Sequence, residues 1–180
     1  MERMLAVMAD DPAAALAGFV GMLCFAACPL FRGRGLLLLA YIGNNIGFAL
    51  HYALLGHWTA VAMNGLMGVQ TAFAIPLERA PQLRWAYYAV IPALALASVL
   101  TWQGLPSLLS VTATALSTLA RLQTQERGLR LLLLASTPAW ALHDVIVGSV
   151  PGLAADLVCF ATGAIMLVRS PGCLTPPRSA

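Results

Sequence analysis

Two polar side chains lie deep inside long apolar stretches of this chain, Asn64 and Asp156. Each follows a glycine, Gly56 or Gly148, by eight positions. On helices that start at those glycines, a rise of about 1.5 Å per residue places both groups roughly 12 Å down, near the middle of a hydrocarbon core about 30 Å thick. Polar groups at this depth are costly without a partner, so the pair predicts a binding site for hydroxyl or amide groups of a solute. Asp156 is the strongest single candidate, and hydrogen bonding between helices is the alternative role.

Two further stripes carry an amide or hydroxyl, an aromatic ring and a histidine at spacings i, i+4 and i+7, which share one helical face. They are Asn44, Phe48 and His51 in the first, and Ser136, Trp140 and His143 in the second. We expect the two aromatic rings to stack on the solute and the two histidines to line its external approach. Because histidine titrates near neutral pH, and because Asp144 follows His143 and Asp156 lies one helix away, coupling to protons is chemically feasible. Capping or bridging of helices is the alternative role of the histidines.

Isolated histidines on separate helices do not make a metal site, so no metal ligand is expected. The remaining histidine, His57, is expected to be solvated. The four cysteines show neither a disulfide framework nor the spacing of a zinc site, which predicts small apolar packing residues.

The polar positions repeat at a fixed offset of 92. Matches among leucines and alanines carry little weight in so apolar a chain, whereas rare residues falling into register indicate a common origin. The sequence therefore predicts an internal duplication, the alternative being two similar membrane patterns that agree by coincidence. The matching segments are Ala49-Leu50-His51 with Gly56 and Asn64 in the first copy, and Ala141-Leu142-His143 with Gly148 and Asp156 in the second.

Composition fixes the class of protein. With 60% hydrophobic and 9% charged residues and a mean hydropathy of +0.82, the chain has too little polar surface to coat a globule in water. We therefore expect an integral membrane protein that contacts the lipid bilayer. A span needs about 20 mostly apolar residues, and each such stretch is expected to be a helix because backbone groups must be paired in lipid. Seven windows qualify: Pro12–Leu30, Leu36–Leu55, Trp58–Pro76, Trp85–Trp102, Pro106–Leu122, Leu129–Val147 and Gly152–Val168.

Arginines predict the orientation of these helices. Arginines follow the first, third, fifth and seventh windows: Arg32 and Arg34, Arg79 and Arg84, Arg121, Arg127 and Arg130, Arg169 and Arg178. The other connections carry no Lys or Arg. The positive-inside rule then places the N-terminus outside and the C-terminus in the cytoplasm of a bacterial inner membrane. The net charge of +3 reflects this topology and gives no support to a nucleic-acid partner.

The offset and the orientation together predict an all-α fold with seven transmembrane helices in a 3+1+3 arrangement of parallel repeats. Residues 1–180 form a single membrane domain: a first three-helix repeat over 12–76, a linker helix over 85–102, a second repeat over 106–168 and a short cytoplasmic tail over 169–180. Repeats of this kind are related by an axis along the membrane normal, and the solute site of such carriers lies near the midplane between the halves. On this plan one chain is enough to form a pore. The plan is also compatible with a homo-oligomer.

Two sequence motifs resemble those of a known protein family. They are His51-Tyr-Ala-Leu-Leu-Gly56, with Asn64 nearby, and the segment from Trp140-Ala-Leu-His143 through Gly152. Over nearly its whole length the chain resembles the YgjV-type bacterial inner membrane protein family. That family often has an arginine shortly after the third-helix asparagine, where this chain has Met67. The 3+1+3 plan is more remotely similar to SWEET sugar carriers and PnuC-type carriers, although the PQ-loop signature is not met.

We therefore expect a carrier, either a facilitator or ion-coupled, for a small and largely neutral solute. An ATP-binding motif is missing from the sequence, as are G-x-S-x-G, H-E-x-x-H and any cofactor motif, so neither a cofactor nor enzymatic activity is expected. The alternatives are a non-transporting membrane subunit or partner protein and, third, an intramembrane enzyme. A closed structure in which neighbouring residues supply hydrogen-bond partners for Asp156 would favour the non-transporting subunit.

Overall fold

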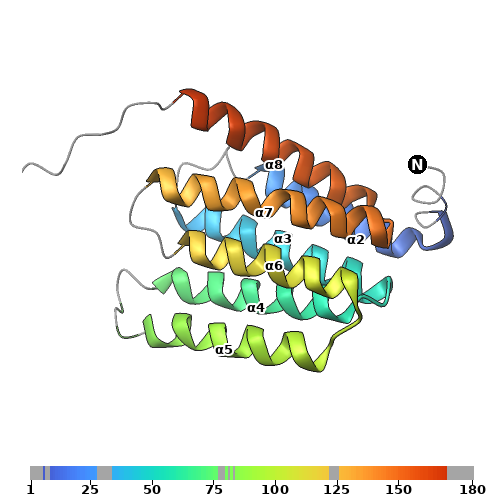
Figure 1. The fold of residues 1–180 in the computed structure, drawn as a ribbon, viewed down its shortest axis with the longest axis horizontal. Helices are drawn as coiled ribbons and strands as arrows, with labels where there is room; N and C mark the ends of the chain where they lie inside the picture. Colours follow the sequence, from blue (N-terminus) through green and yellow to red (C-terminus); the bar gives the residue numbers. More distant parts are fainter. Residues whose placement is uncertain are drawn as a thin grey trace, which may run out of the picture.

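A computed structural model describes residues 6, 9–27, 34–76, 80, 82, 84–121 and 126–169 of the chain. Within these ranges the fold is all-helical and contains seven helices (Figure 1). They are α2 (Pro12–Ala27), α3 (Arg34–Leu54), α4 (Trp58–Ala74), α5 (Arg84–Leu100), α6 (Leu105–Arg121), α7 (Glu126–Val147) and α8 (Val150–Arg169). The predicted count of seven helices is confirmed.

The helix ends agree closely with the seven apolar windows. α4 begins at Trp58 and α7 ends at Val147, as predicted. α7 begins at Glu126, three residues before its window, because charged residues can extend a helix beyond its apolar part. Of the predicted tail over 169–180, Arg169 is the last residue of α8 and residues 170–180 lie outside the described residues. Arg32, Arg79, Cys28 and Cys173 also lie outside the described residues, as does Arg178.

Helices that follow one another in the chain pack side by side. α3 lies between α2 and α4, and α7 lies between α6 and α8. Two further contacts join these groups, α2 with α8 and α4 with α6. α5 packs on α4 and lies at the margin of the bundle (Figure 1). The turns α3–α4, α5–α6 and α7–α8 all lie at one end of the bundle, here called the turn end (Figure 1).

α2 and α3 approach each other at two glycines. A Cβ added to Gly47 would lie 2.5 Å from the Cα of Gly21 and 3.0 Å from the carbonyl oxygen of Ala17. Small residues allow this backbone contact, which is a common way for helices to pack without a driving force from water. The close approach positions the end of α3 against α2 and so fixes where the side chains of its last turns point.

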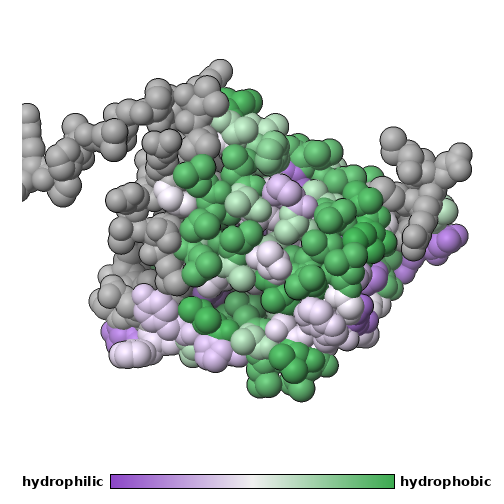
Figure 2. All heavy atoms as spheres, in the orientation of Figure 1, coloured by the Kyte–Doolittle hydropathy of each residue, from purple (hydrophilic) through white to green (hydrophobic). Residues whose placement is uncertain are grey.

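Large apolar side chains cover much of the surface. Trp85, Val99 and Leu100 are 81%, 73% and 74% exposed, and similar residues are exposed on every described helix. Hydrophobic residues dominate the described part of the face drawn in Figure 2, with hydrophilic residues mostly toward its lower margin and right end. By a test of length and mean hydropathy, none of the helices in the described part of the chain qualifies as a membrane span.

Candidate functional site

The α3–α4 and α7–α8 turns have the same backbone geometry. Gly56 and Gly148 adopt φ values of +76° and +84°, a region that glycine enters without strain. The N–H of His57 donates to the carbonyl of Tyr52 at 2.8 Å, and the N–H of Ser149 donates to the carbonyl of Asp144 at 2.9 Å. These are the bonds of a Schellman motif, which ends a helix and satisfies its last carbonyls. Tyr52 and Asp144 therefore occupy the same place at the ends of α3 and α7.

Tyr52 and Asp144 bind each other. The Tyr52 hydroxyl donates to Oδ1 of Asp144 at 2.6 Å, and both side chains are buried, with 2% and 1% exposure. Nδ1 of His143 lies 3.0 Å from the same oxygen. Room for the carboxyl group exists because residue 152 is glycine, where a Cβ would overlap Oδ2 of Asp144. A carboxyl group with two donors on one oxygen can either accept both bonds or exchange a proton with a neighbour.

His51 joins α2, α3 and the start of α8. Its Nδ1 lies 2.7 Å from the carbonyl oxygen of Ala14, so this nitrogen carries hydrogen and donates. Nε2 of His51 lies 2.8 Å from Oγ of Ser149, and in the neutral ring it accepts the serine hydroxyl. Ser149 in turn accepts the N–H of Gly152 at 3.1 Å. The histidine thus bridges helices, which was one of its two predicted roles.

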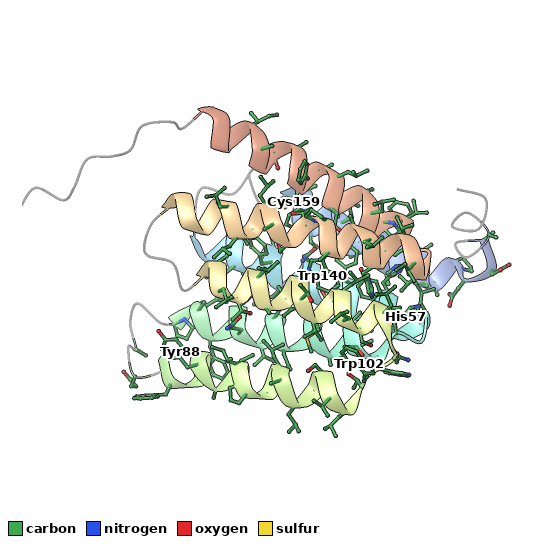
Figure 3. The ribbon with its side chains drawn as sticks, viewed as in Figure 1. His57, Tyr88, Trp102, Trp140 and Cys159 are labelled. Atoms are coloured by element: carbon green, nitrogen blue, oxygen red, sulfur yellow. The ribbon has the colours of Figure 1, made fainter. Side chains whose placement is uncertain are left out.

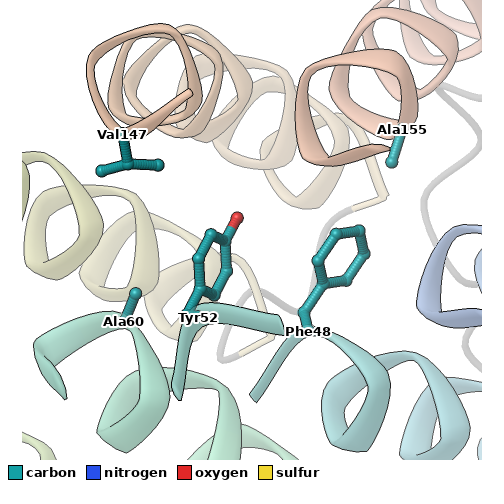
Figure 4. Packing of buried hydrophobic residues seen from close by; sticks show 5 residues of the cluster. All are labelled: Phe48, Tyr52, Ala60, Val147 and Ala155. Atoms are coloured by element: carbon teal, nitrogen blue, oxygen red, sulfur yellow. The ribbon is translucent and has the colours of Figure 1, made fainter. Parts of the chain in front are cut away.

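Aromatic rings enclose the Tyr52 side chain. Its ring stacks on Phe48 at a centroid distance of 5.9 Å and on Trp140 at 6.3 Å, with interplanar angles of 24° and 12°. Figure 4 shows the Phe48 and Tyr52 rings rising from α3 toward Val147 and Ala155, and Figure 3 shows Trp140 near the middle of the bundle. His143 meets the edge of Tyr52 at 5.2 Å. The two aromatics predicted to stack on a solute therefore flank a tyrosine of the protein itself.

His57 belongs to the same cluster, at the turn end (Figure 3). It is half-buried, contrary to the expectation that it is solvated, and its ring centroid lies 6.2 Å from that of His143. Burial, and to a smaller extent the charge of a protonated His143, lowers the pKa of His57.

The predicted pair Asn64 and Asp156 is placed deeper in the bundle. The side-chain amide of Asn64 is buried and donates to the carbonyl of Ala60 on its own helix at 2.9 Å. Oδ2 of Asp156 is buried and, within the described residues, has no hydrogen-bond partner. Asp156 and Asp144 lie within electrostatic range of each other. The structure records no hydrogen bond between Asn64 and Asp156 in its described part.

The other two predicted residues are separate from the cluster. Asn44 is half-buried on α3, two turns before His51. Ser136 is buried and donates its hydroxyl to the carbonyl of Leu133 at 2.7 Å on its own helix. Of the eight predicted site residues, the structure thus brings Phe48, His51, Trp140 and His143 together around Tyr52.

α4 and α6 are joined by hydroxyl groups near the turn end. Oγ1 of Thr59 lies 2.7 Å from Oγ of Ser107 and also donates to the carbonyl of Thr101. The side-chain amide of Gln103 donates to the carbonyl of Gly56 at 2.9 Å, which ties the α5–α6 connection to the α3–α4 turn. Polar contacts thus close this end of the bundle.

Four residues of the cluster were not among the eight predicted site residues: Tyr52, His57, Asp144 and Ser149. One signal was present in the sequence, because Tyr52 and Asp144 correspond at the same offset of 92 as the histidines beside them. Within the described residues no group of three or more His, Cys, Asp or Glu side chains is arranged to hold a metal ion.

Fold and site together define an all-helical protein whose buried polar cluster joins the ends of two helix groups. The chain belongs to the Imp-YgjV family, whose model is described as a bacterial inner membrane protein and matches residues 13–171. No curated protein and no solved structure matches the chain.

Proposed function

We propose that the chain is a carrier that moves a small, largely neutral solute across the bacterial inner membrane by alternating access. The observation that carries the proposal is the bond between Tyr52 and Asp144, because these residues are separated by 92 positions, the offset of the sequence repeat. When a twofold axis relates two units, equivalent residues touch each other only on the axis. The bond therefore supports two three-helix halves, α2–α4 and α6–α8, that meet at this pair, with α5 as the linker.

Contacts away from an axis of this kind must occur in matched pairs. At the offset of 92, His51 corresponds to His143 and His57 to Ser149. The His51–Ser149 hydrogen bond accordingly has a counterpart in the ring contact between His143 and His57. In the same way the packing of α2 on α8 matches the packing of α6 on α4. These pairs support the duplication and the parallel arrangement of the halves, which is a known plan for membrane carriers.

In this proposal all seven helices cross the membrane, with the N-terminus outside and the C-terminus in the cytoplasm. Large exposed apolar side chains support contact with lipid, since water-soluble proteins rarely expose contiguous apolar surface of that extent. The turn end then faces outward, and the arginine-bearing connections face the cytoplasm. Tyr52 and Asp144, near the turn end, form an outer gate.

The solute site lies below that gate. Asn64 and Asp156 bind hydroxyl or amide groups of the solute, and Phe48 and Trp140 stack on it once Tyr52 has moved from between them. A buried carboxyl oxygen that has no hydrogen-bond partner among the described residues supports a ligand-binding role for Asp156, because such an atom is costly unless another molecule satisfies it. In a purely structural subunit, the carboxyl group of Asp156 would be expected to find its hydrogen-bond partners within the protein. No covalent chemistry is involved in this proposal.

Uptake into proteoliposomes tests the proposal. A pooled panel of sugars, nucleosides and amino acids is offered to the wild type, to Asn64→Ala and to Asp156→Ala. Thr162→Ala is the matched control, because its hydroxyl is exposed on α8 and bonds only to its own helix. We expect the wild type and the control to accumulate one class of solute and both site variants to lose at least most of that uptake.

Folding is verified for each variant by thermal unfolding in detergent. Absence of uptake of every solute by the folded wild type would contradict the carrier. Uptake that persists unchanged in both site variants would contradict the assignment of Asn64 and Asp156.

A further inference from the structure

The carboxyl group of Asp144 is almost fully buried, and among the described residues no salt bridge joins it to a side chain with a fixed positive charge. Its exposure is 1%, and within the described residues its ion-pair partner is His143 at 3.0 Å. An ionised carboxylate in this position is expensive, whereas a neutral one is not. The group therefore favours states in which a proton is held by the carboxyl or by the neighbouring imidazole.

Titratable groups lie around Asp144 on α3, on α7 itself, in the α3–α4 turn and on α8, whereas the buried polar residues of α6, which also packs on α7, are serines and threonines. Tyr52 donates to it from α3, and His143 lies beside it on α7. His57 contacts His143 from the α3–α4 turn and is half-buried, which places an exchangeable imidazole between the cluster and the outside. The further groups within electrostatic range of the cluster are His51 on α3, Asp156 on α8 and Asp11 before α2.

The bond from Tyr52 to Asp144 depends on the charge of the carboxyl group. A hydroxyl that donates to an ionised carboxylate makes a charge-assisted bond, which is about twice as strong as a bond between neutral groups. Protonation of Asp144 therefore weakens the contact that holds α3 to α7. Since the two residues come from different halves, a proton that reaches Asp144 favours separation of the halves at the turn end.

We infer that Asp144, with His143 beside it, is the proton-coupling site of this protein, and that its protonation from the outside opens the Tyr52 gate. This inference rests on the proposed carrier function. One proton passes from outer water to the carboxylate, moves inward with the solute when the halves rock, and leaves the carboxyl group on the cytoplasmic side. Transport is then inward symport of solute and proton, and an outside that is more acidic than the inside drives accumulation.

Proteoliposomes that contain a pH-sensitive dye test the inference with the pooled panel of sugars, nucleosides and amino acids as the probe. For one proton per solute, each unit of inward pH gradient supports about tenfold accumulation in the wild type, together with acidification of the lumen. Asp144→Asn keeps an acceptor for the Tyr52 hydroxyl and so the fold, but it cannot release a proton. We expect this variant to lose the acidification and the gradient-driven accumulation, and its residual exchange no longer to depend on outside pH.

Asp10→Asn is the matched control, because Asp10 is an exposed carboxyl group outside the cluster. It is expected to retain accumulation and acidification. His143→Gln is a second test, expected to shift the pH at which transport is half-maximal. Wild-type uptake without lumen acidification, or accumulation by Asp144→Asn, would overturn proton coupling and leave the carrier intact. Absence of all wild-type uptake would overturn the carrier and the inference with it.

Discussion

The end of α3 and the end of α7 share a backbone geometry and differ in their side chains. Both terminate at a glycine with positive φ. In both, the N–H of the residue after the glycine donates to the carbonyl of the residue five positions before it, which is Tyr52 in α3 and Asp144 in α7. At that position α3 has a hydroxyl donor, Tyr52, and α7 has a carboxyl acceptor, Asp144. Two tyrosines there would lack a charged acceptor, and two aspartates would repel each other. Each helix end therefore supplies one partner of a specific contact that two identical side chains would not make.

The packing of α2 on α3 also differs from the packing of α6 on α7. Gly21 and Gly47 bring the backbones of α2 and α3 into contact, whereas the corresponding positions on α6 and α7 are Ala113 and Ala139. The α2–α3 pair therefore has no space for an added methyl group. The α6–α7 pair already accommodates one on each helix.

Gly47→Ala should have the largest effect, because the added Cβ would meet backbone atoms of Gly21, which cannot rotate away. We expect a loss of about 3 kcal/mol in the free energy of unfolding, the upper part of the range for overpacking. Gly65→Ala on α4 is the matched control, because nothing lies within 4 Å of its added Cβ. The control should be neutral or more stable by up to about 1 kcal/mol. Equal effects of the two changes, measured by unfolding in detergent, would refute the tight α2–α3 contact.

Gly152→Ala should come next, because its Cβ would displace the carboxyl group of Asp144. The residue 92 positions earlier is Ala60, which carries a Cβ and is buried. We expect a loss of about 2 kcal/mol, from overpacking of a side chain that can partly move. In the Gly152→Ala background, Tyr52→Phe should cost little, since the bond is already broken. A full additional cost of Tyr52→Phe in that double variant would show that Asp144 had not been displaced.

Tyr52→Phe alone should cost about 1.5 kcal/mol, the value at which the range for bonds between neutral groups meets the range for bonds to charged groups. The ring, and thus its stacking with Phe48 and Trp140, is retained. Thr162→Val, which removes an exposed hydroxyl from α8, is expected to change stability by less than about 0.5 kcal/mol. Thermal and denaturant unfolding of both variants measure the difference. A Tyr52→Phe variant as stable as the wild type would contradict a stabilising bond between α3 and α7.

The smallest effect should come from His57 and depends on pH. Its pKa in the folded protein is lowered from the ordinary value of 6.5. Above that pH both folded and unfolded chains hold a neutral ring, so His57 does not affect the pH dependence. As the pH falls below 6.5, the unfolded chain binds the proton more readily, and stability is lost. We therefore expect the unfolding free energy of the wild type to fall relative to that of His57→Gln as the pH is lowered. Unfolding of both proteins from pH 8 to about 5 measures this difference. A difference that is constant with pH would contradict the burial of this ring.

Helix positions could be predicted from the sequence because apolar stretches are bounded by Gly56, Gly148 and arginines, all of which act locally. The gathering of Phe48, His51, Trp140 and His143 could also be anticipated, since i, i+4 and i+7 spacing places them on two matched faces.

The role of Tyr52 could not be predicted in this way. It arises where the end of α3 meets the end of α7, and this meeting depends on how far the helices tilt and on the contact between Gly21 and Gly47. The hydrogen bond of Asn64 to Ala60 is likewise a rotamer choice that no sequence pattern specifies.

A reversible cross-link between the halves tests the central claim most directly. Oγ1 of Thr59 on α4 and Oγ of Ser107 on α6 lie 2.7 Å apart, so cysteines at both positions suit a disulfide across the turn end. The four native cysteines are first replaced by alanine. Solute uptake into proteoliposomes is then measured for Thr59→Cys with Ser107→Cys, before oxidation, after oxidation and after reduction. The account predicts that oxidation stops uptake and that reduction restores it. Undiminished uptake by fully cross-linked protein would contradict a carrier whose halves separate at this end.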